Sequence, residues 1–154
     1  MDKENTLYID LKDGRVIIAM RPDLAPTHVA QIKKLAREGK YDGVVFHRVI
    51  DGFMAQTGDP TGTGSGGMGE TLKSEFSKEP HVRGAVSMAR TSDPHSARSQ
   101  FFICFKDSNF LDGQYTVWGM VTSGMECVDK IKRGEPPSNP DRMLKIRVAA
   151  DVKE

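Results

Sequence analysis

Hydrophobic and polar residues alternate along the first part of the chain in the period-two pattern of β-strands. Two such segments, 7–11 and 16–20, lie on either side of Asp13-Gly14, a dipeptide that favours a tight turn. The apolar positions of the two segments are Leu7, Ile9, Leu11, Val16, Ile18 and Met20. The sequence therefore predicts a β-hairpin here, ended by Pro22 and Pro26.

A helix is predicted next, opening at Pro26, because a proline in the first turn of a helix loses no hydrogen bond. Apolar residues recur at helical spacing over 29–36, and Gly39 is placed to end the helix. A second, short helix is indicated by Ser123 and Glu126, which have the spacing of a capping box. Its apolar face would carry Met125, Val128 and Ile131.

Short apolar runs separated by turn residues account for most of the remaining chain. These runs are 44–50, 53–56, 85–89, 101–105, 116–121 and 144–152. Together with the hairpin they give about eight strands and only two helices. The segments 57–69, rich in glycine, and 134–142, rich in proline, are expected to be long loops. So many short strands favour a closed barrel or a sandwich over a parallel α/β sheet.

Length and composition predict one globular domain over residues 1–154, with 38% hydrophobic residues to form its core. The 22 Lys and Arg balance the 21 Asp and Glu, so neither nucleic acid nor a membrane is expected as a partner. The N-terminal residues lack the pattern of a secretory signal. Cys104 and Cys127 are expected to be buried and reduced, although a disulfide stays open. We expect a cytoplasmic protein, with a monomer as the default state.

Several common catalytic signatures are missing. No Cys-x-x-Cys pair occurs, the four histidines lack the spacing of a helical zinc site, and there is no Gly-x-Ser-x-Gly elbow. Gly62, Gly64 and Gly67 fit the dinucleotide-binding pattern, but no strong helix is predicted after them. Moreover, Ser87 stands about where that pattern needs an acidic residue. We therefore expect a surface loop, no metal and no nucleotide cofactor.

Segment 41–58, YDGVVFHRVIDGFMAQTG, places Arg48 inside an otherwise apolar strand. Phe53, Met54 and Gln56 follow at short distance. Two interpretations stay open for Arg48: it has a role in binding or catalysis, or its aliphatic stem only lies along the barrel. For the Phe53-Met54 pair taken alone, core packing is the ordinary role.

Two further segments combine polar and aromatic residues in a similar way. Segment 85–105, AVSMARTSDPHSARSQFFICF, places Gln100 and Phe102 on one face of a strand. Segment 108–119, SNFLDGQYTVWG, groups three apolar or aromatic residues around an Asp-Gly turn: Phe110, Leu111 and Tyr115. Trp118 is expected in the core. Each segment alone is typical of core packing, and only the combination is specific.

Together, the three segments resemble the cyclophilin family of peptidyl-prolyl cis-trans isomerases. The stretches FHRVIDGFMAQTG (46–58), SQFFI (99–103) and FLDGQYTVWG (110–119) match motifs of that family in the same order. The resemblance covers essentially the whole chain, and the short loops are most similar to the compact bacterial cyclophilins. It implies a mainly β fold: a closed eight-stranded antiparallel barrel capped by two α-helices, with the active site on its outer face.

The resemblance also implies roles for individual residues. The catalytic residues would be Arg48, Phe53, Gln56 and Phe102. The pocket for the proline ring would consist of Phe53, Met54, Phe102 and Leu111, and the groove for the peptide of Gln56, Ala89, Arg90, Gln100, Phe110 and Tyr115. Three positions depart from the best-known eukaryotic pattern, since Arg90 replaces an asparagine, Phe110 a tryptophan and Tyr115 a histidine. These changes affect the expected peptide preference and drug binding, but not the expected chemistry.

The implied activity is rotation about the bond preceding proline in peptides and in unfolded or folded client proteins. No bond is broken in this reaction, so it needs no cofactor and no nucleophile. The competing hypothesis is a module or chaperone that binds proline-containing segments with little turnover. Retention of Arg48 favours the enzyme, because a binding module has less need of a guanidinium. We also expect weak binding of cyclosporin, because Phe110 lacks the indole N–H of tryptophan.

Overall fold

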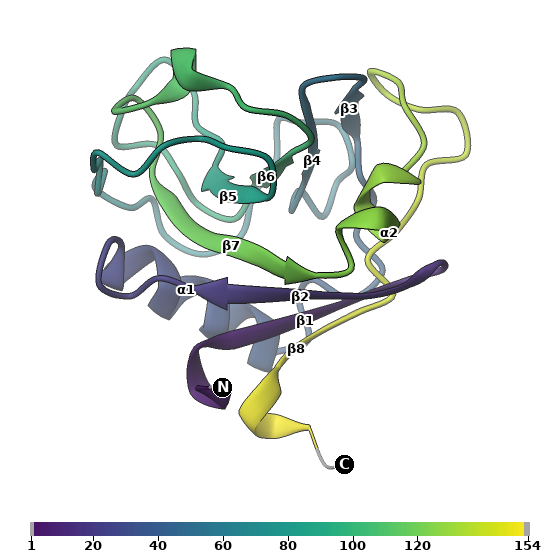
Figure 1. Ribbon diagram of the computed structural model, residues 1–154, viewed down its shortest axis with the longest axis horizontal. Coiled ribbons are helices and arrows are strands. Elements are labelled where there is room, and N and C mark those ends of the chain that lie inside the picture. Colours follow the sequence, from purple (N-terminus) through teal and green to yellow (C-terminus); the bar gives the residue numbers. More distant parts are fainter. Residues whose placement is uncertain (1, 153–154) are drawn as a thin grey trace.

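The computed structural model describes residues 2–152, in which eight strands form one antiparallel sheet (Figure 1). The strands are β1 (Thr6–Leu11), β2 (Gly14–Met20), β3 (Arg48–Ile50), β4 (Met54–Thr57), β5 (Ala85–Met88), β6 (Phe101–Cys104), β7 (Val117–Ser123) and β8 (Lys145–Val148). Their order across the sheet is β3-β4-β6-β5-β7-β2-β1-β8. The mainly β fold and the number of strands predicted from the sequence are thus confirmed.

The predicted N-terminal hairpin is formed by β1 and β2, with Leu7 opposite Ile18 and Leu11 opposite Gly14. The two residues of the turn are therefore Lys12 and Asp13. Gly14 has a φ of +141°, and a Cβ atom there would lie 2.9 Å from Cys127 Sγ. A side chain at this position would therefore be both strained and crowded.

The first predicted helix is confirmed as α1 (Pro26–Arg37), whose buried residues include Val29, Ile32 and Leu35. The second predicted helix is also present, as α2 (Met125–Asp129), but its predicted capping box is wrong. Ser123 stays in β7 opposite Ile17, so its side chain does not cap the helix. Gly124 takes the N-cap position instead, with a φ of +85° that suits glycine.

The sheet curls into a barrel, but the barrel is not closed by a ladder between its two edge strands, β3 and β8. Among residues 2–152, those at this seam form isolated bridges instead, Val45 with Arg142 and Val49 with Gly134. The prediction of a closed barrel was therefore overstated. The physical reason lies in the segment opposite β3, in which Pro136, Pro137 and Pro140 have no N–H to donate.

Two of the predicted strands are shorter than the apolar runs from which they were predicted. The apolar run 44–50 contributes only Arg48–Ile50 as a strand, and the run 144–152 contributes only Lys145–Val148. The last of these runs continues as a 3₁₀-helix over Ala149–Asp151. Hydrophobicity alone therefore located the strands but not their ends.

Alternate residues along the central strands, such as β4 and β6, belong to two different hydrophobic clusters. Ala55, Phe101 and Ile103 point into the main core, in which Trp118 is fully buried as predicted. Their neighbours on the opposite face form a second, smaller cluster of Met54, Ala85, Phe102, Cys104 and Leu111. Since side chains alternate along a strand, one sequence can build the core and an outer surface together.

Both cysteines are buried and free, which confirms that expectation. Cys104 is 0% exposed and Cys127 is 7% exposed. Burial raises the pKa of the Cys104 thiol to about 12. In residues 2–152, no helix has both the length and the apolar character that crossing a membrane would require.

Candidate active site

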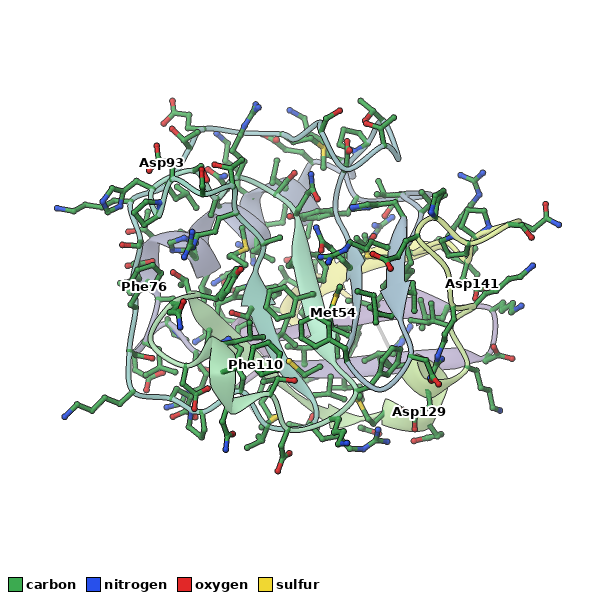
Figure 2. The ribbon with its side chains drawn as sticks, turned by 90° about the horizontal axis from the view of Figure 1, so that it is seen from above. Met54, Phe76, Asp93, Phe110, Asp129 and Asp141 are labelled. Carbon is green, nitrogen blue, oxygen red and sulfur yellow. The ribbon has the colours of Figure 1, made fainter. Side chains whose placement is uncertain are left out.

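A pocket of about 100 Å³ lies on the outer face of the barrel, over the smaller hydrophobic cluster. It brings together nine of the eleven residues that the resemblance had singled out: Arg48, Phe53, Met54, Gln56, Ala89, Arg90, Phe102, Leu111 and Tyr115. Figure 2 looks onto this face and shows Met54 near its centre. The pocket has two contrasting parts, an apolar floor and a polar side.

The floor of the pocket is apolar and rigidly held. Met54 from β4 and Phe102 from β6 are 1% and 4% exposed, and Leu111 follows in a 3₁₀-helix at 7%. Met54 pairs with Cys104, and Gln56 with Phe102, in the ladder between β4 and β6. Because these positions are fixed by the strand ladder, the floor is already formed without a ligand.

Phe110 and Gln100, the two expected residues outside the pocket lining, lie immediately beside it. Phe110 is 67% exposed, and its ring centroid lies 5.5 Å from that of Phe53. Figure 2 shows Phe110 on the same face as Met54. Gln100 is joined to the pocket by a hydrogen bond from Gln56 Nε2 to its side-chain oxygen, 2.8 Å long.

The polar side of the pocket is built around Arg48. Arg48 lies directly opposite Gln56 on neighbouring strands, and its Nη1 donates to Gln56 Oε1 at 3.3 Å. Its Nε lies 3.2 Å from the carboxylate of Glu135 in the proline-rich loop. The Arg48 side chain is 46% exposed, so the guanidinium is oriented by two partners while it still faces solvent.

The polar network continues from Gln56 into the glycine-rich loop. Gln100 Nε2 donates to the carbonyl oxygens of Gly64 and Gly66 at 2.9 and 2.8 Å. The loop is folded around Asp59, whose buried carboxylate accepts hydrogen bonds from the N–H groups of Thr61, Gly64 and Gly66. An unbroken series of hydrogen bonds therefore leads from this carboxylate to the guanidinium of Arg48.

Asp59 stays ionised in spite of its burial. Desolvation raises the pKa of the carboxyl group, but hydrogen bonds from the Thr61 hydroxyl and from three backbone N–H groups outweigh it. The net result is a pKa lowered to about 2. A charged acceptor that receives several hydrogen bonds from one loop stabilises the conformation of that loop.

A buried histidine supports the apolar floor from behind. His81 stacks on the ring of Phe102 at 6.2 Å, and its Nδ1 lies 3.0 Å from Asp112 Oδ1. Its Nε2 lies 3.0 Å from the hydroxyl of Ser87. Burial lowers the pKa of His81, and the hydrogen bond to Asp112 opposes that shift. Although Ser87, His81 and Asp112 have the residue types of a hydrolase triad, Ser87 is fully buried, so the group is structural.

Three contributors to the site were not anticipated from the sequence: Asp59, His81 and Glu135. Asp59-Pro60 was a detectable signal, since an aspartate next to glycines and threonines often folds a turn on itself. Glu135 could not be found in this way, because it lies 87 positions from Arg48. The two residues meet because the proline-rich loop that carries Glu135 lies across the barrel seam from β3.

The dinucleotide-like glycine pattern does not have the structure that this motif requires. Residues 58–84 contain turns, bends and an isolated bridge, but no helix. A helix N-terminus to hold a phosphate is therefore missing from this segment. Within residues 2–152, no group of three or more His, Cys, Asp or Glu residues is arranged to hold a metal ion.

Comparison with known proteins gives a consistent result. Residues 6–149 match the family model described as cyclophilin type peptidyl-prolyl cis-trans isomerase/CLD. A probable peptidyl-prolyl cis-trans isomerase of Brucella suis is 56% identical, over 99% of this chain and 86% of the relative.

Solved structures agree with the sequence comparison. A cyclophilin from Hirschia baltica superposes with a TM-score of 0.91 at 32% identity, covering 99% of this chain and 77% of that one. A Cryptosporidium parvum cyclophilin type isomerase, crystallised in the presence of the dipeptide Ala-Pro, gives 0.86 at 27% identity, covering 93% and 98%. The fold, the pocket and these relatives agree, and the chain belongs to the cyclophilin-type peptidyl-prolyl cis-trans isomerase family.

Proposed function

We propose that this chain accelerates cis-trans isomerisation of X-Pro bonds, with Arg48 as the catalytic residue and the apolar pocket as the seat of the proline ring. The observation that carries the proposal is the position of the Arg48 guanidinium at the edge of a pocket whose floor is apolar. The Ala-Pro dipeptide used with the Cryptosporidium parvum relative supports a proline-containing substrate.

The physical problem that such a catalyst faces is the double-bond character of the peptide bond. Resonance sets a barrier of about 18–20 kcal/mol, so an uncatalysed X-Pro bond isomerises over tens to hundreds of seconds. The catalyst must bind the twisted amide more tightly than either planar form. Twisting localises a lone pair on the proline nitrogen, and a guanidinium donor stabilises that state.

The apolar floor and the polar side of the pocket have different proposed roles. Met54, Phe102 and Leu111, with Phe53 at the rim, hold the proline ring while the preceding carbonyl swings. Gln56 orients Arg48 through the 3.3 Å hydrogen bond, and Glu135 holds Nε, which leaves donors on the Nη atoms directed to the substrate. The remaining groove residues, for which we propose contact with the peptide backbone, are Ala89, Arg90, Gln100, Phe110 and Tyr115.

A protease-coupled assay on a proline-containing tetrapeptide tests the proposal directly. We expect the purified chain to accelerate the slow cis-to-trans phase in proportion to its concentration. A chain that binds the peptide, as detected by calorimetry, without any acceleration would show that it is a binding module instead. Arg133→Ala is a suitable control, because Arg133 pairs with Asp51 and lies outside the pocket lining.

We further propose that the chain works as a monomer in the cytoplasm on proline-containing segments of client proteins. Its two buried free cysteines suit a reducing compartment. Among the described residues, the large hydrophobic side chains left exposed are Phe76, Phe110 and Leu144. So few exposed apolar side chains favour a monomer over an obligate oligomer.

A further inference from the structure

A second depression opens beside the proline pocket and differs from it in chemistry. It shares Gln56, Ala89 and Arg90 with the proline pocket, and its volume is about 460 Å³. Its lining includes Arg98 and five residues with hydroxyl groups: Ser65, Thr71, Thr91, Ser96 and Ser99. A peptide with its proline in the first pocket can therefore place a nearby side chain in this one.

The two arginines of this depression carry charges that the protein does not neutralise. Arg98 donates through Nε and Nη2 to the carbonyl oxygen of Gly69, at 3.1 and 2.9 Å. Arg90 donates through Nε to the carbonyl of Gln114 and through Nη1 to that of Thr91, both at 2.9 Å. These acceptors are uncharged, so they fix the guanidinium groups in place without pairing their charge.

This arrangement is unusual within the described chain. Of its ten arginines, seven form an ion pair with a carboxylate: Arg15, Arg21, Arg37, Arg48, Arg83, Arg133 and Arg147. The other three are Arg90, Arg98 and Arg142, so two of the three line one depression.

No aspartate or glutamate lies in the lining of this depression. The acidic residues nearest in sequence are Glu70 and Asp93, and neither is part of the lining. Asp93 Oδ1 accepts a hydrogen bond from the N–H of His95 in its own loop. The carboxylate of Asp59 lies behind the loop, where the N–H groups of Gly64 and Gly66 donate to it, so the charged groups in the lining itself are the two guanidinium groups.

We propose that Arg90 and Arg98 form an anion-recognising subsite that selects client segments with an aspartate or glutamate close to the proline. The proposal rests on the isomerase function proposed above and adds a substrate class to it. A carboxylate in this depression would accept from guanidinium donors that the protein leaves without a charged partner. A lysine at the same place would be repelled by two fixed charges.

The test compares kcat/KM for acetylated, amidated peptides with a central Ala-Pro-Phe. One series carries Glu, Gln or Lys two residues before the proline, and a second series carries them two residues after it. In one of the two series we expect Glu to exceed Lys by on the order of fivefold at low salt. This preference should shrink as ionic strength rises, because the charges are solvent-accessible.

Variants then assign the preference to the two arginines. Arg98→Gln and Arg90→Gln should each reduce the Glu-to-Lys ratio, and Arg98→Glu should invert it. Arg142→Gln is the matched control, since Arg142 also donates to a backbone carbonyl, that of Gly43, but lies outside the depression. It should keep the ratio of the unmodified chain.

The outcomes separate the two proposals. If all peptides are accelerated and neither series shows a charge preference, or if the preference survives Arg98→Glu, the subsite is wrong while the isomerase function stands. If no peptide is accelerated, the isomerase function itself is wrong.

Discussion

Arg48 and Gln56 face each other across the β3–β4 ladder, and Arg48 Nη1 lies 3.3 Å from Gln56 Oε1. The relation fixes the direction of the guanidinium by backbone pairing rather than by a flexible loop. Arg48 is also held by Glu135 from the opposite side of the barrel seam. The donor proposed to act on the prolyl amide is therefore oriented before any substrate arrives.

Replacement of Arg48 tests this arrangement. We expect Arg48→Ala to lower kcat/KM by about a hundredfold or more, which corresponds to roughly 3 kcal/mol of transition-state stabilisation. Arg48→Lys should restore little activity, because an ammonium cannot reproduce the fork of donors. The thermal unfolding midpoint should change little, since the side chain is 46% exposed. A folded alanine variant with full activity would contradict the assigned role.

The lowered pKa of Asp59 predicts that the folded protein loses stability in acid. The pKa of Asp59 is lowered from 3.8 to about 2 in the folded protein, so folding favours the ionised carboxylate. Its contribution, about 2 kcal/mol, is fully present above pH 4 and disappears as the pH falls through about 2. Urea unfolding at pH 7 and at pH 2.5 measures the total loss of stability in acid, to which Asp59 contributes together with other carboxylates of lowered pKa, such as those of Glu75 and Asp129.

Asp59→Asn isolates the part of the acid sensitivity that belongs to this residue. The variant should be less stable than the unmodified chain at pH 7, and the difference should narrow toward pH 2. Its kcat/KM should also fall, because the loop that accepts the Gln100 hydrogen bonds is no longer held. An equal stability difference at both pH values would exclude titration of Asp59 as the cause.

The glycine-rich loop is predicted not to bind NAD or ATP. Gly62 to Gly67 are followed by irregular structure, so no helix N-terminus is available for a phosphate. Calorimetry with each nucleotide at millimolar concentration should show no saturable heat. Saturable binding that disappears in Gly64→Ala would overturn this prediction.

Because position 110 is a phenylalanine, we expect cyclosporin to inhibit this isomerase weakly. The ring is exposed at the edge of the pocket and has no N–H to donate to a bound peptide carbonyl. One missing hydrogen bond of this kind lowers affinity by roughly 5- to 150-fold. We therefore expect Phe110→Trp to tighten inhibition while kcat/KM on peptides stays within a few-fold. Inhibition of the unmodified chain as strong as that of tryptophan-bearing relatives would contradict this account.

The sequence predicted the position of a side chain well where the alternation along its own strand determines the face on which it lies. The alternation around Gln100 and Phe102 placed these two residues on one face of a strand, and in the structure Phe102 lies in the pocket lining and Gln100 beside it. Matching of motifs then supplied the roles proposed for them. Local patterns carry such information because the period of a strand is fixed by covalent geometry.

Features that depend on distant segments could not be read in the same way. The Arg48–Glu135 pair joins residues 87 positions apart, and the stacking of His81 on Phe102 depends on how two strands and a loop converge. The predicted N-cap of α2 was wrong because Ser123 pairs with Ile17 in the ladder between β2 and β7. This strand pairing outweighs the tendency of serine to cap a helix. In each case a tertiary contact overrode a local preference.

The placement of the pocket floor on β4 and β6 has a consequence for redesign. Met54, Gln56 and Phe102 alternate with core residues on the same strands, so they cannot be moved without disturbing the barrel. Segments 58–69, 89–98 and 109–115 border the pocket outside the strands and carry little of that core. Exchanging the first two of these loops for those of a relative should transfer the choice of client and leave the chemistry in place, whereas 109–115 carries Leu111 of the pocket floor and should be kept.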